Sequence, residues 1–370
     1  MRFFAILVHD DMLASIVWLQ KRWSGDPVGL RGPDRILVVK LDRIGDMINT
    51  IPVLDELARR FPRAAIDMVA HPVPLSFFDG DPRIRERIVY RSALYHAVPF
   101  LPPSWNEWKT VVSLARRRYP LVVYLRGSAP FLLLGARSRF AATKYVMNEH
   151  VVERYLKAIR PFVRDARQRP ATLHLSAVAK RSAAELLGST GVLRIAIHAT
   201  AAVALKEWPL DRYVALADEL RRRYRADIHF LASPAERDRL EAALAGSTSK
   251  HLVHTSLSLG KVAALIAACD LFVGNDSGLS HVAAAVNTPM VLVWGPANIH
   301  EAKPLADPAR CAIEYRAVPC RSRCPEIRCV NDAVPMQCLR DVQLQDVLAA
   351  AGRMLETESE ETWRRVVPAS

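Results

Sequence analysis

The sequence predicts an α/β protein made of two doubly wound parallel-sheet domains in tandem. Apolar runs suited to buried parallel strands alternate with segments of helical periodicity. The alternation starts near residue 35 and restarts near residue 190. The length of 370 residues also suits two domains, because one domain commonly has about 150 residues. Such folds bind ligands at the carboxyl ends of their strands, so we expect both sheets to face a central cleft.

The first domain is predicted at residues 35–185. It opens with the run ILVVKL at 36–41, which is typical of a buried strand. Helices are expected at 47–61 and 105–118, and further strands at 66–70 and 121–125. The segment from about 150 to 190 is helical and polar and is interrupted by prolines, which indicates a join between domains.

The second domain is predicted at residues 186–350. We expect strands at 194–197, 227–231, 271–273 and 290–294, and helices at 211–224, 235–245, 262–269 and 281–286. A helical tail follows at 351–370. Residues 1–34 are an N-terminal extension with apolar residues near helical spacing. For this extension we favour a segment that packs against the rest of the protein, or translation that begins at Met12, over a helix that lies on a membrane.

Charge is distributed unevenly along the chain. Residues 1–185 carry a net charge of +13, and residues 186–370 carry none. A basic half can attract nucleic acid, an anionic membrane surface or a phosphorylated substrate, although Arg-rich codon usage is an alternative cause. No apolar run approaches the roughly 18 to 20 residues that span a bilayer. Asp10 and Asp11 interrupt the apolar region of a would-be signal peptide, so we expect a cytoplasmic protein.

Two motifs follow predicted strands in the two halves of the chain. Asp46, after Gly45, lies where a strand turns into a helix, a position that stabilises a carboxylate. Taken alone, it is more simply a helix cap. Lys206 lies in the segment KEWP after a strand. Lys206 suits a phosphate, but an exposed loop lysine is an equal alternative.

Two further motifs are typical of nucleotide binding. The stretch GNDSGLSH at 274–281 follows a strand and opens a helix, where backbone N–H groups can hold a diphosphate without a metal. It is neither a Walker A sequence nor a G-x-G-x-x-G sequence, and a plain capped turn is the alternative. Glu236 lies at the start of a helix, where it could accept hydrogen bonds from a ribose. The alternative is that its negative charge simply stabilises the helix N-terminus.

Four cysteines lie close together near the end of the second domain: Cys320, Cys324, Cys329 and Cys338. Four thiols could bind zinc or an iron–sulfur cluster, but the paired C-x-x-C spacing of common zinc sites is missing. We therefore favour reduced cysteines or a redox-sensitive loop over a metal, and we expect no cofactor.

These motifs, in this order, resemble glycosyltransferase family 9, the lipopolysaccharide heptosyltransferases and their relatives. The resemblance covers about residues 35–350. It rests on ILVVKLDRIGDMINTIPVLDELARRFP at 36–62, LKEWPLDRYVALADEL at 205–220 and LSLGKVAALIAACDLFVGNDSGLSHVAAAVNTPMVLVWGP at 257–296. It implies a GT-B fold, with the acceptor-side domain first and the nucleotide-sugar domain second.

The resemblance also implies an inverting, metal-independent transfer of heptose from ADP-heptose to a lipopolysaccharide core or related cell-envelope glycan. The basic first half further suggests an anionic glycolipid or oligosaccharide as acceptor at the inner face of the cytoplasmic membrane, which the protein would contact peripherally. Asp46 would be the general base. The residues that the resemblance implies for donor binding are Lys206, Ser277 and Gly278 at the diphosphate, Asp276 at the sugar, Glu236 at the ribose and Leu257 near the base.

The sequence departs from the family at several points. Leu-Asp-Arg precedes Ile-Gly-Asp where small polar residues are usual, and Tyr124 replaces an acidic residue before Arg126-Gly127. The stretch ATAAVALK after His198 is expected to lack the usual hydroxyls.

The alternatives to heptose transfer from ADP-heptose are transfer from another nucleotide-sugar donor, a GT-B sugar-nucleotide epimerase, or a non-catalytic basic binding protein. Because the sequence holds no recognised nucleic-acid module, we expect no nucleic acid partner.

Overall fold

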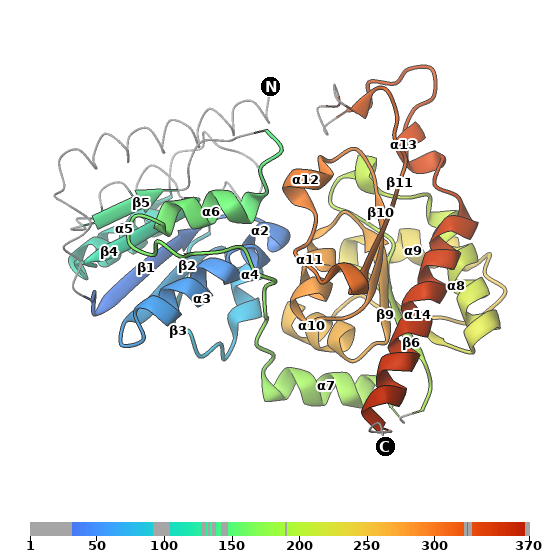
Figure 1. Ribbon diagram of the computed structural model, residues 1–370, viewed down its shortest axis with the longest axis horizontal. Helices are drawn as coiled ribbons and strands as arrows, with labels where there is room; N and C mark the ends of the chain where they lie inside the picture. The colour runs from blue at the N-terminus through green and yellow to red at the C-terminus, as the bar shows by residue number, and fades with distance from the viewer. Residues whose placement is uncertain are drawn as a thin grey trace. The chain divides into compact units, whose positions relative to one another are not determined.

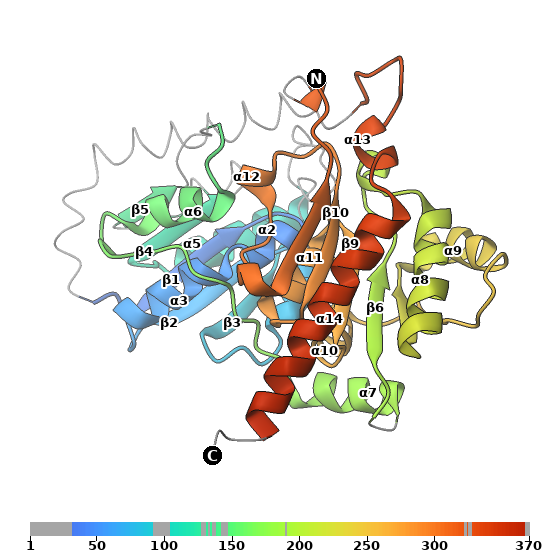
Figure 2. The same ribbon diagram turned by 45° about the vertical axis from the view of Figure 1, so that its right-hand side comes forward.

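The computed structural model divides the chain into two compact units, Met1–His174 and Leu175–Ser370 (Figures 1 and 2). It describes residues 32–91, 104–126, 131, 134, 138–141, 147–188, 191–321, 324 and 328–366. Most of the N-terminal extension, residues 1–31, lies outside the described residues, as does Gly127. Within the described ranges, no helix combines the length and the apolar character needed to cross a membrane.

The first unit is built on a five-stranded parallel sheet in the order β3-β2-β1-β4-β5. Its strands are β1 (Arg35–Lys40), β2 (Ala65–Ala70), β3 (Ile84–Val89), β4 (Leu121–Arg126) and β5 (Ser138–Ala141). The sequence predicted β1, β2 and β4, which are buried almost throughout because they occupy the centre of the sheet. It missed β3, because this edge strand alternates half-buried and exposed residues and reads as polar.

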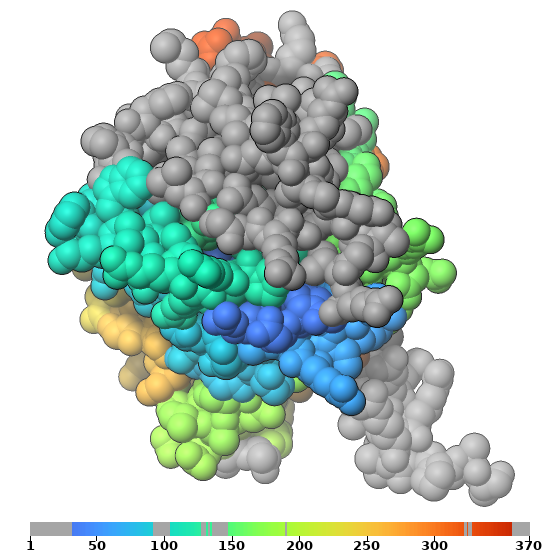
Figure 3. All heavy atoms as spheres, turned by 90° about the vertical axis from the view of Figure 1, so that its left-hand side faces the viewer, coloured from blue at the N-terminus to red at the C-terminus, as the bar shows by residue number. Residues whose placement is uncertain are grey.

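The helix predicted at 47–61 is two helices, α2 (Ile44–Ile48) and α3 (Ile51–Arg60). The break lies at Asn49-Thr50, and Pro52 lies in the first turn of α3, where its missing N–H costs no hydrogen bond. The other helices are α4 (Pro72–Leu75), α5 (Trp105–Arg116) and α6 (Val151–Ile159). Figure 3 shows α5, in teal, at the surface of this unit, where Trp105 is 73% exposed.

The second unit is built on a six-stranded parallel sheet in the order β11-β10-β9-β6-β7-β8. Its strands are β6 (Arg194–His198), β7 (Asp227–Leu231), β8 (Leu252–His254), β9 (Leu271–Asn275), β10 (Met290–Trp294) and β11 (Cys311–Tyr315). The sequence predicted the four central strands and missed β8 and β11. Both missed strands are sheet edges that carry exposed or half-buried residues.

Helices surround this second sheet: α7 (Ala177–Leu187), α8 (Leu210–Tyr224), α9 (Arg237–Leu244), α10 (Leu259–Ala267), α11 (Gly278–Ala285), α12 (Ile299–Ala302), α13 (Gln337–Arg340) and α14 (Leu344–Val366). The units divide after residue 174, whereas the sequence placed the boundary after residue 185. The difference is α7, which contacts α10 and so belongs to the second unit.

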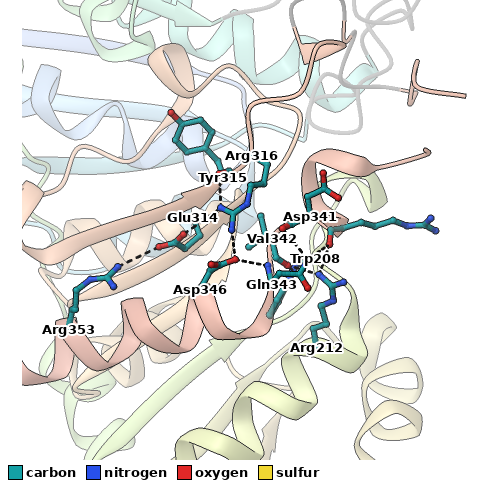
Figure 4. Close-up of polar contacts among 11 residues, drawn as sticks. Trp208, Arg212, Glu314, Tyr315, Arg316, Asp341, Val342, Gln343, Asp346 and Arg353 are labelled. Atoms are coloured by element: carbon teal, nitrogen blue, oxygen red, sulfur yellow. Dashed lines mark hydrogen bonds and ion pairs between the residues drawn. The ribbon is translucent and has the colours of Figure 1, made fainter. Parts of the chain in front are cut away.

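The C-terminal helix α14 is part of the second unit's core, although the sequence set residues 351–370 apart as a tail. Within that predicted tail, Ala351 and Leu355 are buried together with residues of β6, β9 and β10. Figure 4 shows the polar contacts that accompany this packing. Arg316 pairs with Asp346, Arg353 lies 3.6 Å from Glu314, and the Gln343 N–H donates to Asp346 at 2.8 Å.

Candidate active site

Each sheet has one point at which the order of its strands reverses. In the first unit it lies between β1 and β4, and in the second between β6 and β9. Ligands of doubly wound folds bind beyond the carboxyl ends of the strands at such points. Asp46 follows β1, and Asp276 and Ser277 follow β9. The topology therefore places the main predicted site residues at the two switch points.

In the first unit, Asp46 lies on α2, directly after the loop that leaves β1. The Tyr155 hydroxyl, from α6, lies 3.2 Å from Asp46 Oδ1. The fully buried Lys40 at the end of β1 donates to Tyr155, and also to Asp42 Oδ2 at 3.1 Å. Arg126 at the end of β4 donates to Asp42 Oδ2 at 2.9 Å. These contacts make one polar network across the β1–β4 switch point.

A β-bulge brings Arg126 into this network. Val39 pairs with Tyr124, but the next residue, Lys40, pairs with Arg126, so the register skips Leu125. Bulges redirect side chains and are frequent beside active sites. Tyr124, at a position where the resemblance implies an acidic residue, is buried and donates to the Phe131 carbonyl, so it belongs to the core.

The two carboxylates of the network have pKa values that move apart. Burial alone would raise the pKa of Asp42, but the Arg126 and Lys40 charges and the Arg43 backbone N–H outweigh it and hold this pKa well below its usual range. Burial, together with the Asp42 charge, raises the pKa of Asp46 despite Lys40, Arg126 and Arg154. When the pKa values of two neighbouring carboxylates differ in this way, one carboxylate stays charged and the other can exchange a proton. Asp46 is therefore the carboxylate suited to accept a proton.

In the second unit, Lys206 lies beside the loop that follows β9. Its Nζ is 2.6 Å from Asp276 Oδ2, and both side chains are mostly buried. Ser277 is the N-cap residue of α11, and its side chain makes no capping bond to that helix. Instead, Ser277 Oγ lies 3.1 Å from His198 Nδ1 at the end of β6. The structure thus brings Lys206, Asp276 and Ser277 together at the N-terminus of α11, which begins at Gly278.

Asn275, the last residue of β9, holds the Lys206 loop in place. It is fully buried, and its side-chain oxygen accepts from the Trp208 N–H at 2.9 Å and from the Tyr213 hydroxyl at 3.0 Å. Its amide nitrogen donates to the Ala199 carbonyl at 3.0 Å. One amide side chain therefore joins β9, the segment after β6 and the KEWP turn. These hydrogen bonds of Asn275 position the loop that carries Lys206.

Glu236 is held at the edge of the same group. It closes a capping box by accepting from the Ser233 N–H at 2.7 Å. Burial would raise the pKa of Glu236, but hydrogen bonds from Ser233 and Thr200 and the nearby His198 lower it. Burial lowers the pKa of His198 to about 4, against the opposing charge of Glu236. Leu257 is half-buried in the loop between β8 and α10.

Sequence reasoning missed several residues of these groups. Lys40, Asp42 and Tyr155 were not singled out. The stretch after His198 was expected to lack the usual hydroxyls, which was wrong for Thr200: its buried hydroxyl lies 3.4 Å from His198 Nε2. A charged residue inside an apolar strand, such as Lys40, was the available signal. Tyr155 gave no such signal, because it lies 109 residues from Asp46 in the chain.

The four clustered cysteines line a common cavity. Cys320, Cys324, Cys329 and Cys338 surround it together with Leu205 and Pro296. All four are unbridged, and burial raises the pKa of Cys338. Within the described part of the chain, no three or more His, Cys, Asp or Glu residues are arranged to hold a metal ion.

Comparison with known proteins matches residues 115–330 to the model of glycosyltransferase family 9 (heptosyltransferase). Lipopolysaccharide heptosyltransferase 1 of Pseudomonas aeruginosa is 26% identical over 294 residues, which cover 71% of this chain and 79% of that protein. Lipopolysaccharide heptosyltransferase 3 of Escherichia coli is 23% identical over 85% of this chain and 97% of its own length. The solved structure of E. coli ADP-heptose lipopolysaccharide heptosyltransferase II, at 23% identity, has a TM-score of 0.70 and covers 88% of this chain and 99% of that one.

Proposed function

Because the chain belongs to glycosyltransferase family 9, we propose that it moves heptose from ADP-heptose to a lipopolysaccharide core or related cell-envelope glycan, with inversion and without a metal. The family makes the protein a glycosyltransferase of lipopolysaccharide biosynthesis with the GT-B fold. The ADP-heptose donor is inferred from the named E. coli relative. Direct displacement at the anomeric carbon is the chemistry that the two groups of residues support.

Asp46 acts as the general base in this reaction. The acceptor hydroxyl oxygen forms a bond to the anomeric carbon while its proton passes to the Asp46 carboxylate. The anomeric carbon–oxygen bond to the diphosphate breaks, and ADP leaves with the electron pair. A carboxylate with a raised pKa suits this role. The observation that carries the proposal is the polar network at the β1–β4 switch point: Lys40 and Arg126 both donate to Asp42, which leaves Asp46 as the proton-accepting carboxylate among the described residues there.

The second unit stabilises the leaving diphosphate. The Lys206 ammonium and the backbone N–H groups at the start of α11, around Ser277 and Gly278, supply positive charge and donors without a metal ion. Asp276, which orients Lys206 through their ion pair, also lies where the sugar of the donor would bind. Glu236 accepts from the ribose hydroxyls, and Leu257 lies against the base.

The acceptor is an anionic glycolipid or oligosaccharide at the inner face of the cytoplasmic membrane, which the protein contacts peripherally. The support is the net charge of +13 in residues 1–185 against zero in residues 186–370, since a basic surface attracts phosphorylated groups.

The proposed function is tested by mixing the protein with ADP-heptose and a heptose-deficient lipopolysaccharide core. The expected result is release of ADP in step with a product one heptose heavier. Thermal unfolding with a series of nucleotide-sugars identifies the donor, because the true donor raises the melting temperature. Stabilisation by another nucleotide-sugar but not by ADP-heptose would overturn the donor assignment. Conversion of the donor without any acceptor would favour the epimerase.

A further inference from the structure

We propose that Tyr155 is a positioning residue for Asp46: its hydroxyl occupies one carboxylate oxygen and leaves the other to take the acceptor's proton. This inference rests on the proposed function, in which Asp46 is the base. Tyr155 lies on α6, far along the chain from Asp46 on α2, and the two side chains meet at 3.2 Å. Neither the motifs of the sequence nor the comparisons assign Tyr155 a role.

The direction of the Tyr155–Asp46 hydrogen bond follows from the contact that Tyr155 also makes with Lys40. A lysine ammonium has three donors and no acceptor, so in the Lys40–Tyr155 contact the phenol oxygen must accept. The phenol has one proton of its own, and Asp46 Oδ1 is an acceptor within reach. The chain of donation therefore runs from Lys40 to Tyr155 to Asp46. It fixes Oδ1 as the bonded oxygen and makes Oδ2 the base.

Burial and neighbouring contacts hold Lys40 in the position from which it donates to Tyr155. Its side chain is fully buried, its Nζ lies 4.1 Å from the centre of the Tyr155 ring, and it also donates to Asp42. Asp42 is itself held by Arg126. The ammonium is thereby shared between a permanent carboxylate and the phenol instead of pairing with Asp46. A direct Lys40–Asp46 ion pair would weaken the base, and Tyr155 stands between the two groups.

Among the described residues, the charged and titratable groups that face Asp46 are Asp42 from the β1–α2 loop, Lys40 from β1, Arg126 from β4, and Arg154 and Tyr155 from α6. Burial, with the Asp46 and Asp42 charges, raises the pKa of Tyr155 well above its ordinary value. The phenol therefore stays protonated and remains a donor. A donor to a carboxylate favours its charged form, so removing the donor raises the pKa of Asp46 further.

The test replaces Tyr155 by Phe and follows kcat/KM for transfer against pH. We expect the acid limb, where Asp46 takes up a proton, to move to higher pH by about one unit, since hydrogen bonds to charged groups change equilibria about tenfold or more. The KM for the donor should stay unchanged. Tyr119→Phe is the matched control, because Tyr119 is a buried tyrosine of the same unit whose hydroxyl lies 2.6 Å from the Asp67 carboxylate. Its acid limb should match that of the wild type.

A ring-fluorinated tyrosine at position 155 keeps the shape of the side chain and guards against misfolding of Tyr155→Phe. A more acidic phenol donates more strongly, so the acid limb should move to lower pH. An unmoved limb in both variants, or an equal shift in Tyr119→Phe, would overturn the proposal.

Titration of the Asp46 carboxyl carbon by NMR, assigned with Asp46→Asn, needs no substrate and separates the two inferences. If no transfer is found but the pKa of Asp46 still rises in Tyr155→Phe, the proposed function fails and the positioning role stands. If transfer occurs and this pKa does not move, the positioning role fails alone.

Discussion

His198 Nδ1 lies 3.1 Å from Ser277 Oγ, so one side-chain contact joins the end of β6 to the start of α11 at the second unit's switch point. Because burial lowers the pKa of His198 to about 4, its ring is neutral at physiological pH. A neutral ring adds no positive charge beside Lys206. Lys206 therefore supplies positive side-chain charge at the N-terminus of α11, and the expectations for donor binding and for chelation depend on it.

Asp46→Asn should reduce transfer by well over about 100-fold, because the amide cannot accept the acceptor's proton. Donor binding should be nearly unchanged, since the residues proposed to bind the donor belong to the other unit. Single-turnover rates and donor titrations measure the two effects. Asp34→Asn, which removes an exposed carboxylate just before β1, is the control. Wild-type turnover in Asp46→Asn would remove this residue from the mechanism.

Lys206→Ala should weaken ADP-heptose binding by about tenfold or more, because the proposed charge-assisted contact to the diphosphate is lost and Asp276 is left without its ion-pair partner. Calorimetric titration of the donor measures the change. Lys250→Ala, at an exposed position of the same unit, should bind like the wild type. Equal affinities for Lys206→Ala and the wild type would show that the diphosphate does not bind at Lys206.

Transfer should survive exhaustive chelation, because in the proposed mechanism Lys206 and the start of α11 take the place of a magnesium ion at the diphosphate. Rates measured before and after treatment with EDTA and a thiol-specific chelator check this. Activity that disappears and returns only with a divalent cation would contradict the metal-free mechanism. Unfolding on chelation would instead assign a structural metal to the cavity of Cys320, Cys324, Cys329 and Cys338.

Acceptor affinity should fall as salt rises, while donor affinity should change less. Attraction between the basic first half and an anionic acceptor is screened over about 8 to 10 Å at physiological salt, whereas the proposed donor contacts are close ones in the neutral half. Both affinities are measured over one salt series. Parallel slopes would leave the basic half as a solvated surface without a role in acceptor choice.

Acid should destabilise the second unit through the stacked pair of His229 and His254, whose ring centroids lie 5.3 Å apart. Burial and the neighbouring His254 lower the pKa of His229 to about 4, and burial lowers that of His254. Between the unfolded value of about 6.5 and these lowered values, the unfolded chain binds more protons. The free energy of unfolding therefore falls as pH drops through this window, by up to about 1.4 kcal/mol per pKa unit.

Urea unfolding across pH 4 to 7 measures this loss. His229→Phe should flatten the pH dependence, because the variant loses the most depressed group of the pair. An identical pH dependence in the variant would assign the acid sensitivity to other groups, among them His198.

The central strands and the two switch points could be predicted because their signal is local. Runs such as ILVVKL are continuous and apolar, and the residue after such a run must lie at the carboxyl end of a sheet. The same reasoning reached Asp46, Lys206 and Ser277. It could not reach Tyr155, since what makes this residue important is a contact between α6 and α2 that no periodicity records. Nor could it find the split of α2 from α3, which depends on where Pro52 falls in the turn.

The contacts of Val342 have a consequence for synthesis. Its carbonyl accepts from Trp208 Nε1 at 3.0 Å and from Arg212 at 2.5 Å, and α14 then fills the core beside β9 and β10. The ribosome delivers these residues about 130 positions after the KEWP turn that they support. At about 5–20 residues per second, Val342 is synthesised roughly 7 to 26 seconds after that turn. The first unit meanwhile has all five strands of its sheet synthesised, so that sheet can form before the second unit receives α14.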